Sequence, residues 1–175
     1  MIMPKIILYI AASEDGYIAD TEGGVGWLDK YNDSGEDCGY ADFFTSIDAL
    51  IIGRKTYGQI LGFGAWPYEA KPCYVFSRDC IPLPKDAGAS VHLVSDALAA
   101  WLAEQPEDKR YWLVGGAELA QAFLNLSAID EVILTTLPEK LGSGIMLPTA
   151  IWSAIQGIAP SQKYPNGILQ YTFSL

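Results

Sequence analysis

The chain has 175 residues, half of them apolar and 18% charged, with a formal net charge of −10. This composition is typical of a folded globular protein, and the length predicts a single domain over residues 1–175. Because proteins that bind nucleic acid or anionic membranes normally present basic surfaces, the acidic balance argues against both partners. It also makes the few clustered cations informative.

Cysteine usage and the amino-terminal residues indicate a cytoplasmic protein without structural metal. The three cysteines, Cys38, Cys73 and Cys80, are odd in number and lack C-x-x-C spacing, so neither a disulfide framework nor a zinc site is expected. The first ten residues have no basic segment followed by a long apolar core, which predicts a strand rather than a signal peptide. No apolar run has the length of a membrane span. A reducing, cytoplasmic setting is therefore expected.

The first part of the chain predicts a buried strand, a loop and a helix. Lys5–Ala12 is a continuous apolar run of strand length, as in a central strand covered on both faces. Residues 13–29 are rich in glycine and acidic residues and predict a loop. That loop carries Ile18 and Trp27, which either pack on the core or line a pocket, and packing is the commoner role. Aromatic residues at helical spacing predict a helix over Tyr40–Ser46.

The remainder alternates predicted strands and helices. Strands are expected over Ala49–Gly53, Pro72–Phe76, Val91–Val94, Tyr111–Val114 and Ile129–Leu137, and helices over Arg54–Leu61, from Ser95 or Asp96 to about Glu104, over Ala117–Leu124 and near Ile151–Ile155. Asn166-Gly167 then predicts an antiparallel hairpin between residues 158–164 and 168–173. This order predicts an α/β fold: a mostly parallel sheet flanked by helices, with one antiparallel edge.

Two of these strands end in glycine and lead directly into a helix. Gly53 is followed by Arg54-Lys55-Thr56, and Gly115-Gly116 is followed by Ala117. A helix start offers unpaired N–H groups and the positive end of the helix dipole, which together attract anions. Two such starts in one sheet indicate a long phosphate ligand held at two points, such as a dinucleotide. The alternatives are a solvated pair of surface cations and an ordinary tight turn.

Ser77-Arg78 follows a third strand and adds a further cation. Arg54 and Arg78 could grip a terminal phosphate bidentately, which favours NADPH over NADH. The alternative for Arg78 is a turn residue paired with Asp79. The glycines do not form the G-x-G-x-x-G fingerprint, because its third position is missing.

Catalytic side chains are scarce. The single histidine, His92, lies inside a predicted strand and is expected to be a structural or edge residue. The absence of an evident nucleophile or metal cluster fits a reaction carried out by a cofactor. Asp29 or Asp42 could assist protonation of a substrate ring, although either could equally be a surface acid or a helix cap.

Seven short motifs in this order resemble the dihydrofolate reductase fold and, within it, the reductase domain of bifunctional riboflavin-biosynthesis deaminase-reductases. They are Ala11-Ala12-Ser13, Asp15–Ala19, Trp27-Leu28, Ile52–Tyr57, Val75–Arg78, Leu113–Leu119 and Asp130–Thr135. The resemblance spans almost the whole chain. It implies an eight-stranded sheet and an NADPH-dependent reductase.

The resemblance also implies roles for individual residues. The cofactor's phosphates would be held by Gly53, Arg54, Lys55 and Thr56, its adenosine side and extra phosphate by Ser77 and Arg78, and its pyrophosphate by Val114, Gly115, Gly116, Ala117, Glu118 and Leu119. Ala12 would touch the nicotinamide carboxamide, and the Ile18–Trp27 segment would form a mobile lid. Trp27, Asp42 and Thr135 would lie on the substrate side. Glu118 departs from the resemblance, since many relatives carry a basic residue there.

The expected activity is hydride transfer from NADPH to a heterocyclic C=N or C=O group. A ribosylaminopyrimidine reductase of the riboflavin pathway and a dihydrofolate reductase both fit this expectation. The alternatives are an NADP(H)-binding module without turnover and a nucleotide- or flavin-binding protein. A homodimer is expected, because relatives pair through sheet edges and because the terminal hairpin carries the apolar residues Ile168, Leu169, Tyr171 and Phe173.

Overall fold

The computed structural model describes residues 4–68, 71–79, 82–83 and 90–175, so Cys80 and most of the turn between the third and fourth predicted strands lie outside the described residues. The strands are β1 (Lys5–Ser13), β2 (Tyr17–Ala19), β3 (Ala49–Gly53), β4 (Cys73–Phe76), β5 (Val91–Val94), β6 (Arg110–Gly115), β7 (Glu131–Leu137), β8 (Ile145–Met146), β9 (Gln162–Lys163) and β10 (Leu169–Ser174). The α-helices are α1 (Asp29–Asn32), α2 (Tyr40–Ser46), α3 (Arg54–Gly62), α4 (Leu98–Ala103), α5 (Ala117–Asn125) and α6 (Thr149–Ala154). Three short 3-10 helices, η1 (Gly26–Leu28), η2 (Ile155–Gly157) and η3 (Pro165–Gly167), complete these elements.

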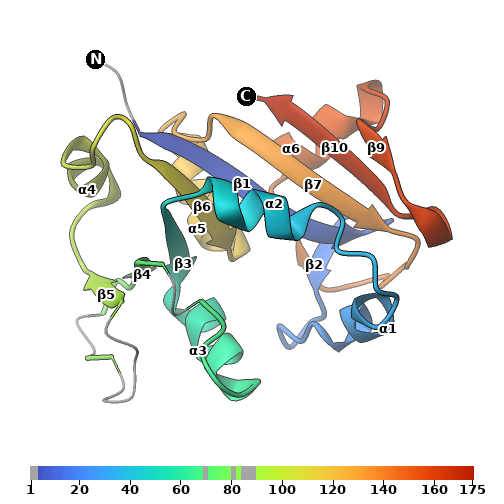
Figure 1. Cartoon of the computed structure of the whole chain (residues 1–175), viewed down its shortest axis with the longest axis horizontal. Helices are drawn as coiled ribbons and strands as arrows, with labels where there is room; N and C mark the ends of the chain where they lie inside the picture. Colours follow the sequence, from blue (N-terminus) through green and yellow to red (C-terminus); the bar gives the residue numbers. More distant parts are fainter. Residues whose placement is uncertain (1–3, 69–70, 80–81, 84–89) are drawn as a thin grey trace. The chain divides into compact units, whose positions relative to one another are not determined.

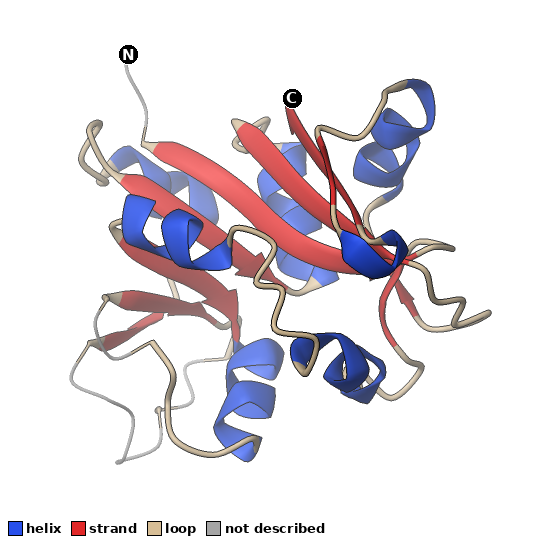
Figure 2. Cartoon of the chain, turned by 45° about the vertical axis from the view of Figure 1, so that its right-hand side comes forward, coloured by secondary structure: helices blue, strands red, loops and turns tan. Residues whose placement is uncertain are grey.

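The main sheet has eight strands in the hydrogen-bonded order β5-β4-β3-β6-β1-β7-β10-β9. The pairs from β5 to β1 are parallel, whereas β10 runs antiparallel to both β7 and β9. Helices flank these strands (Figures 1 and 2). The predicted α/β class, with a mostly parallel sheet and an antiparallel carboxy-terminal hairpin, is therefore confirmed.

The chain divides into two compact units, which are described in turn. Unit 1 comprises the chain up to Leu8 together with Ser46–Asp130, and unit 2 comprises Tyr9–Thr45 together with Glu131–Leu175. The expectation that residues 1–175 form one domain stays a prediction.

Unit 1 is built from parallel strands, and its central strand β3 is buried over four of its five residues. Leu50, Ile51 and Ile52 of β3 have no measurable exposure, which explains why this strand shows no alternation of polar and apolar residues. Helix α3 connects β3 to β4, α4 connects β5 to β6, and α5 follows β6 (Figure 1). Phe123 of α5 is fully buried, and its ring meets Phe76 of β4 edge-on at 6.2 Å between centroids.

Three expectations for unit 1 can be compared with the structure. Helix α4 begins at Leu98 with Ala97 at its N-cap and no capping side chain, so the prediction that Ser95 or Asp96 caps it is wrong. Cys73, at which neither a disulfide nor a zinc site is expected, is buried, and burial raises the pKa of its thiol to about 12, which keeps it protonated. His92 is exposed on the edge strand β5, against the Tyr74 ring.

Unit 2 contains the predicted terminal hairpin. Asn166 and Gly167 have φ values of 62° and 78°, and the N–H of Ile168 donates to the carbonyl of Pro165 at 3.5 Å. Positive φ at both central residues is the pattern of a type I′ turn, which matches the twist of the strands on either side. The hairpin prediction from Asn-Gly is confirmed.

The same hairpin corrects one argument for a homodimer. Ile168 is 2% exposed, and the side chains of Leu169, Tyr171 and Phe173 are half-buried within the chain's own fold. None of these four residues is fully exposed: β7 pairs with β10 along Leu169–Ser174, and β9 pairs with it at Leu169 and Gln170. The homodimer itself stays a prediction.

The structure adds a two-stranded ribbon that the sequence did not indicate. β2, within the predicted 13–29 loop, pairs antiparallel with β8, which lies between β7 and α6. Strands of three and two residues are too short to carry a periodic pattern.

Among the described residues, no helix combines the length and the apolarity that crossing a membrane requires.

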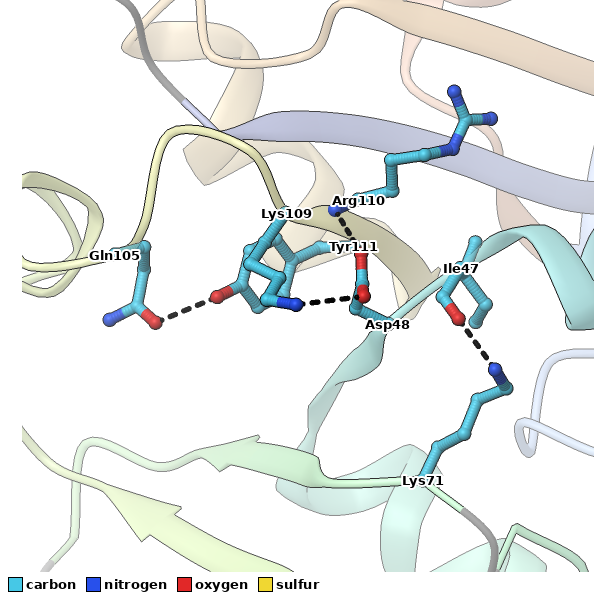
Figure 3. A network of polar contacts seen from close by, with 7 residues as sticks. All are labelled: Ile47, Asp48, Lys71, Gln105, Lys109, Arg110 and Tyr111. Carbon is cyan, nitrogen blue, oxygen red and sulfur yellow. Dashed lines mark hydrogen bonds and ion pairs between the residues drawn. The ribbon is translucent and has the colours of Figure 1, made fainter.

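A polar network fixes the amino-terminal ends of β3 and β6 in unit 1 (Figure 3). The Asp48 carboxylate accepts hydrogen bonds from the backbone N–H of Arg110 at 2.9 Å and from Lys109 Nζ at 3.1 Å. Lys71 Nζ donates to the carbonyl of Ile47, and the Tyr111 hydroxyl donates to Gln105 Oε1. The hydrogen bond from the Arg110 N–H has the largest effect on the pKa of Asp48 and lowers it; burial acts in the opposite direction, and the Lys109 side chain adds to the lowering.

We expect Asp48→Ala to lower the free energy of unfolding by about 1 kcal/mol, because it removes a charge-assisted hydrogen bond from a partly exposed, screened carboxylate. The difference from wild type should be full above the unfolded pKa of about 4 and should shrink as the pH falls through the lower folded pKa. Urea unfolding at pH values on both sides of that window measures it. An equal loss at all pH values would show that the ionised carboxylate is not responsible.

Candidate cofactor site

The candidate site lies at the carboxyl ends of three adjacent strands in unit 1. β3 is hydrogen-bonded between β4 and β6, with Gly53 beside Phe76 and Ile52 beside Gly115. Parallel strands place their carboxyl ends at one edge of the sheet, where open α/β sheets bind ligands. This register brings the residues that follow β3, β4 and β6 together.

Two helices begin at this edge without a capping side chain. Gly53 is the N-cap of α3 and Gly116 is the N-cap of α5, both with extended backbone. Their first-turn N–H groups are therefore not satisfied by a side chain of the cap, and each helix adds the positive end of its dipole. Both helices have nine residues, which is enough to sustain such a dipole.

The backbones of the two helix starts approach one another closely. A methyl group placed on Gly53 would lie 3.6 Å from the Gly115 oxygen and from the Gly116 nitrogen. A methyl group on Gly116 would lie only 3.2 Å from Thr56 Oγ1, so a larger residue there would push Thr56 aside. The Gly115–Gly116 peptide bond is cis. The glycines thus leave open a surface of backbone donors at which a phosphate could approach closely.

Cations surround these helix starts, and one carboxylate joins two of them. Lys55 Nζ lies 3.2 Å from Glu118 Oε1, and Arg78 Nη2 lies 3.0 Å from Glu118 Oε2. The side chains of Lys55, Arg78 and Glu118 are 91%, 89% and 69% exposed, so water and salt screen both ion pairs. Arg54 Nη2 donates to the carbonyl of Pro82 at 3.3 Å. Arg78 is thus paired with Glu118, and not with Asp79 as the alternative interpretation held.

Many of the residues predicted to hold the cofactor are neighbours in unit 1. Contacts in the structure link Gly53, Lys55, Thr56, Arg78, Gly115, Gly116, Glu118 and Leu119. Val114 is half-buried in β6, Ala117 begins α5, and the Ser77 hydroxyl donates to the carbonyl of Asp79. The three cations Arg54, Lys55 and Arg78 outnumber the two nearby carboxylates, Glu118 and Asp79, which suits an anionic ligand such as a dinucleotide.

Six other predicted residues lie in unit 2: Ala12, Ile18, Trp27, Asp29, Asp42 and Thr135. Ala12 is fully buried in β1, and Ile18 lies in β2. Trp27 lies in η1, and its Nε1 is buried without a hydrogen-bond partner among the residues that the structure describes. Asp29 and Asp42 are both exposed, in the first turns of α1 and α2.

Thr135 belongs to a polar cluster inside unit 2. Gln170 Nε2 donates to Thr135 Oγ1 and to the carbonyl of Cys38, both at 3.0 Å. The Tyr9 hydroxyl also donates to the Cys38 carbonyl, at 3.3 Å, and Tyr164 donates to Gln170 Oε1. Burial, followed by the nearby Cys38 and Tyr164, raises the pKa of Tyr9, so it stays a neutral donor. Gln170 was not predicted, because a glutamine in a strand carries no motif.

Asp15 is a second unpredicted residue of unit 2. Its carboxylate accepts hydrogen bonds from Ser13 Oγ at 2.7 Å and from the backbone N–H groups of Leu141 and Gly142. Burial acts to raise the pKa of Asp15, but these hydrogen bonds outweigh it and lower the pKa. The carboxylate fastens the segment before β2 to the segment before β8. Asp15-Gly16 was visible in the sequence as part of a motif, but its partners more than a hundred residues away were not.

The segment expected to form a lid, Ile18–Trp27, begins shortly after Asp15. The Ile18–Trp27 segment includes part of β2 and a turn in which Asp20 Oδ1 accepts from the N–H groups of Glu22 and Gly24. The structure therefore shows an ordered, hydrogen-bonded segment where the sequence predicted a plain loop. Its movement over a cofactor stays a prediction.

Comparison with known proteins gives two curated relatives from Bacillus subtilis (strain 168). The uncharacterized protein YwjB is 38% identical over 148 residues, which is 82% of this chain and 82% of YwjB. The uncharacterized protein YyaP is 28% identical over 97% of this chain and 94% of its own length. A search of protein-family models gave no match.

Solved structures with the same fold are similar over 97% of this chain. A Shewanella sp. PV-4 protein provisionally assigned to riboflavin biosynthesis has a TM-score of 0.81, 28% identity and 98% of its length covered. Dihydrofolate reductase from Enterococcus faecalis, complexed with NADP(H) and RAB-propyl, has a TM-score of 0.61 at 17% identity, with 94% of its length covered. A deaminase/reductase from Thermotoga maritima gives 0.62 at 15%, with 56% of its length covered. The predicted dihydrofolate reductase-like fold is confirmed.

Proposed function

The chain belongs to the family of YwjB and has a dihydrofolate reductase-like fold, and from that premise we propose that it is an NADPH-dependent reductase. The observation that carries the proposal is the pair of uncapped helix starts in unit 1, in close backbone contact and surrounded by Arg54, Lys55 and Arg78. Backbone N–H groups and helix dipoles suit the pyrophosphate, and the arginine and lysine side chains suit a terminal phosphate.

Two comparisons support the choice of cofactor and reaction class. The E. faecalis neighbour is a dihydrofolate reductase complexed with NADP(H), and the T. maritima neighbour carries a uracil reductase activity in its name. Both are under 25% identical to this chain, so they support the fold directly and the activity only by analogy. The proposed reaction moves a hydride from NADPH to a C=N or C=O group of a heterocyclic or ribosylaminopyrimidine substrate. The cofactor supplies the hydride, and the protein supplies binding and orientation.

A second candidate function is an NADP(H)-binding module without turnover. It is favoured by one observation: Asp29 and Asp42, the carboxylates predicted to protonate a substrate, are both exposed. A catalytic acid near neutral pH usually needs a buried or apolar setting that keeps its proton in place.

The two functions differ in turnover, which can be measured directly. The purified protein is mixed with NADPH and, in turn, with dihydrofolate and with a phosphoribosylaminouracil, and the loss of nicotinamide absorbance is followed. Oxidation that depends on one of these substrates is expected for the reductase. Binding of NADPH without oxidation by either would favour the module, and no binding would remove both.

A homodimer is proposed as well, on the analogy with the reductase-domain family alone. Gel filtration of dilute protein should then give an apparent mass near twice the chain's 19.0 kDa. A monomer over the whole concentration range would contradict it.

A further inference from the structure

Glu118 occupies a position that a bound phosphate would need. Its two carboxylate oxygens are divided between two cations, Oε1 to Lys55 and Oε2 to Arg78, at 3.2 and 3.0 Å. Lys55 comes from the first turn of α3, Arg78 from the segment after β4, and Glu118 from the first turn of α5. Lys55 and Arg78, from two different segments, thus meet on the carboxylate of Glu118, which comes from a third.

From this geometry we propose that Glu118 is a built-in competitor for the terminal 2′-phosphate of the cofactor and thereby sets the discrimination between NADPH and NADH. The inference rests on the proposed function. A phosphomonoester carries up to two negative charges and three acceptor oxygens, so it matches the same two cations that the carboxylate now holds. It can reach both only if Glu118 turns away, since two anions at one place repel each other.

The exposure of the three side chains allows that exchange. Exposed ion pairs are weak and rotate freely, so displacing Glu118 costs little but not nothing. NADH has a neutral 2′-hydroxyl in place of the 2′-phosphate. It therefore does not need to bind Lys55 and Arg78, and the Glu118 carboxylate keeps both ion pairs. Glu118 therefore weakens the binding of NADPH but not of NADH. Without its charge, Lys55 and Arg78 would favour NADPH over NADH more strongly.

The test uses Glu118→Gln, which keeps the size and polarity of the side chain and removes its charge. Glu107→Gln is the matched control, because Glu107 is an exposed acid of the same unit that lies before the opposite, amino-terminal end of β6. Both variants change the net charge by the same amount. Titrations of nicotinamide fluorescence with NADPH and with NADH give the affinities.

We expect Glu118→Gln to bind NADPH about five-fold more tightly than wild type and NADH within about two-fold, whereas Glu107→Gln changes neither. The gain in NADPH affinity should shrink at high salt. It should disappear in a Lys55→Met/Arg78→Ala background, because both cations that Glu118 pairs with are then absent. Unchanged NADPH affinity, or an equal gain for both nucleotides, would overturn the inference while leaving the proposed function intact. A wild-type protein that binds neither nucleotide would overturn the proposed function, and the role of Glu118 with it.

Discussion

Replacing Arg54 and Arg78 together by alanine is expected to raise the dissociation constant for NADPH by at least about 100-fold. A charge-assisted hydrogen bond contributes about 1.5–3 kcal/mol, and about 1.4 kcal/mol corresponds to a tenfold change in affinity. Arg54 and Arg78 follow the carboxyl ends of the neighbouring strands β3 and β4; Arg54 opens α3, and the Arg78 guanidinium meets Glu118 in the first turn of α5. Fluorescence titration of the double variant against wild type measures the loss.

The single variants and a control separate the causes. Arg78→Ala should weaken NADPH more than NADH, because only NADPH carries the extra phosphate that Arg78 is proposed to meet. Lys163→Ala removes an exposed cation from β9 in unit 2 and should leave both affinities unchanged. An equal effect of Lys163→Ala would mean that net charge, and not the position of the arginines, controls binding.

Gly144→Ala is expected to cause a large loss of stability in unit 2. Gly144 has a φ of +152°, and a Cβ there would lie 2.1 Å from the backbone oxygen of Ala19, far inside contact distance. Neither atom can yield without separating β8 from β2, so we expect a loss of about 3 kcal/mol or more in the free energy of unfolding. Chemical denaturation measures it, and hydrogen exchange at Tyr17 and Ala19 reports on the ribbon.

Gly142→Ala is the matched control for this substitution. Gly142 lies two residues earlier and also has positive φ, at +72°, but a Cβ there would meet nothing within 4 Å. Only the backbone penalty of about 1–2 kcal/mol is expected. Equal losses for the two variants would show that the close approach to Ala19 does not govern the stability of the ribbon.

The main sheet was predictable because each buried strand carries a local signal. Ala49–Gly53 and Val91–Val94 were located to the residue, since their short length and their β-branched residues between turn signals favour strands over helices. Asn166-Gly167 fixed the hairpin for the same local reason. The ribbon of β2 and β8 has no such signal, because its pairing depends on Asp15 and on contacts between segments far apart in the sequence.

The candidate site was predictable to a similar degree. Glycines after strands and the neighbouring cations marked the helix starts of unit 1, and the structure brings those residues into contact. What the sequence could not show is the pairing of Glu118 with both Lys55 and Arg78, because it depends on the register of three strands. The cluster around Gln170 was invisible for the same reason. Asp29, Asp42 and Thr135 stay predictions as catalytic residues.

Titration of the wild-type protein with NADPH and NADH tests the central claim most directly. The fluorescence of the nicotinamide ring is followed at moderate and at high salt, with the same preparation for both nucleotides. The account predicts saturable binding of NADPH, weaker binding of NADH, and a difference between them that narrows as salt screens the phosphate contacts. Binding of neither nucleotide would contradict the account, and would mean that the helix starts at Gly53 and Gly116 are structural turns only.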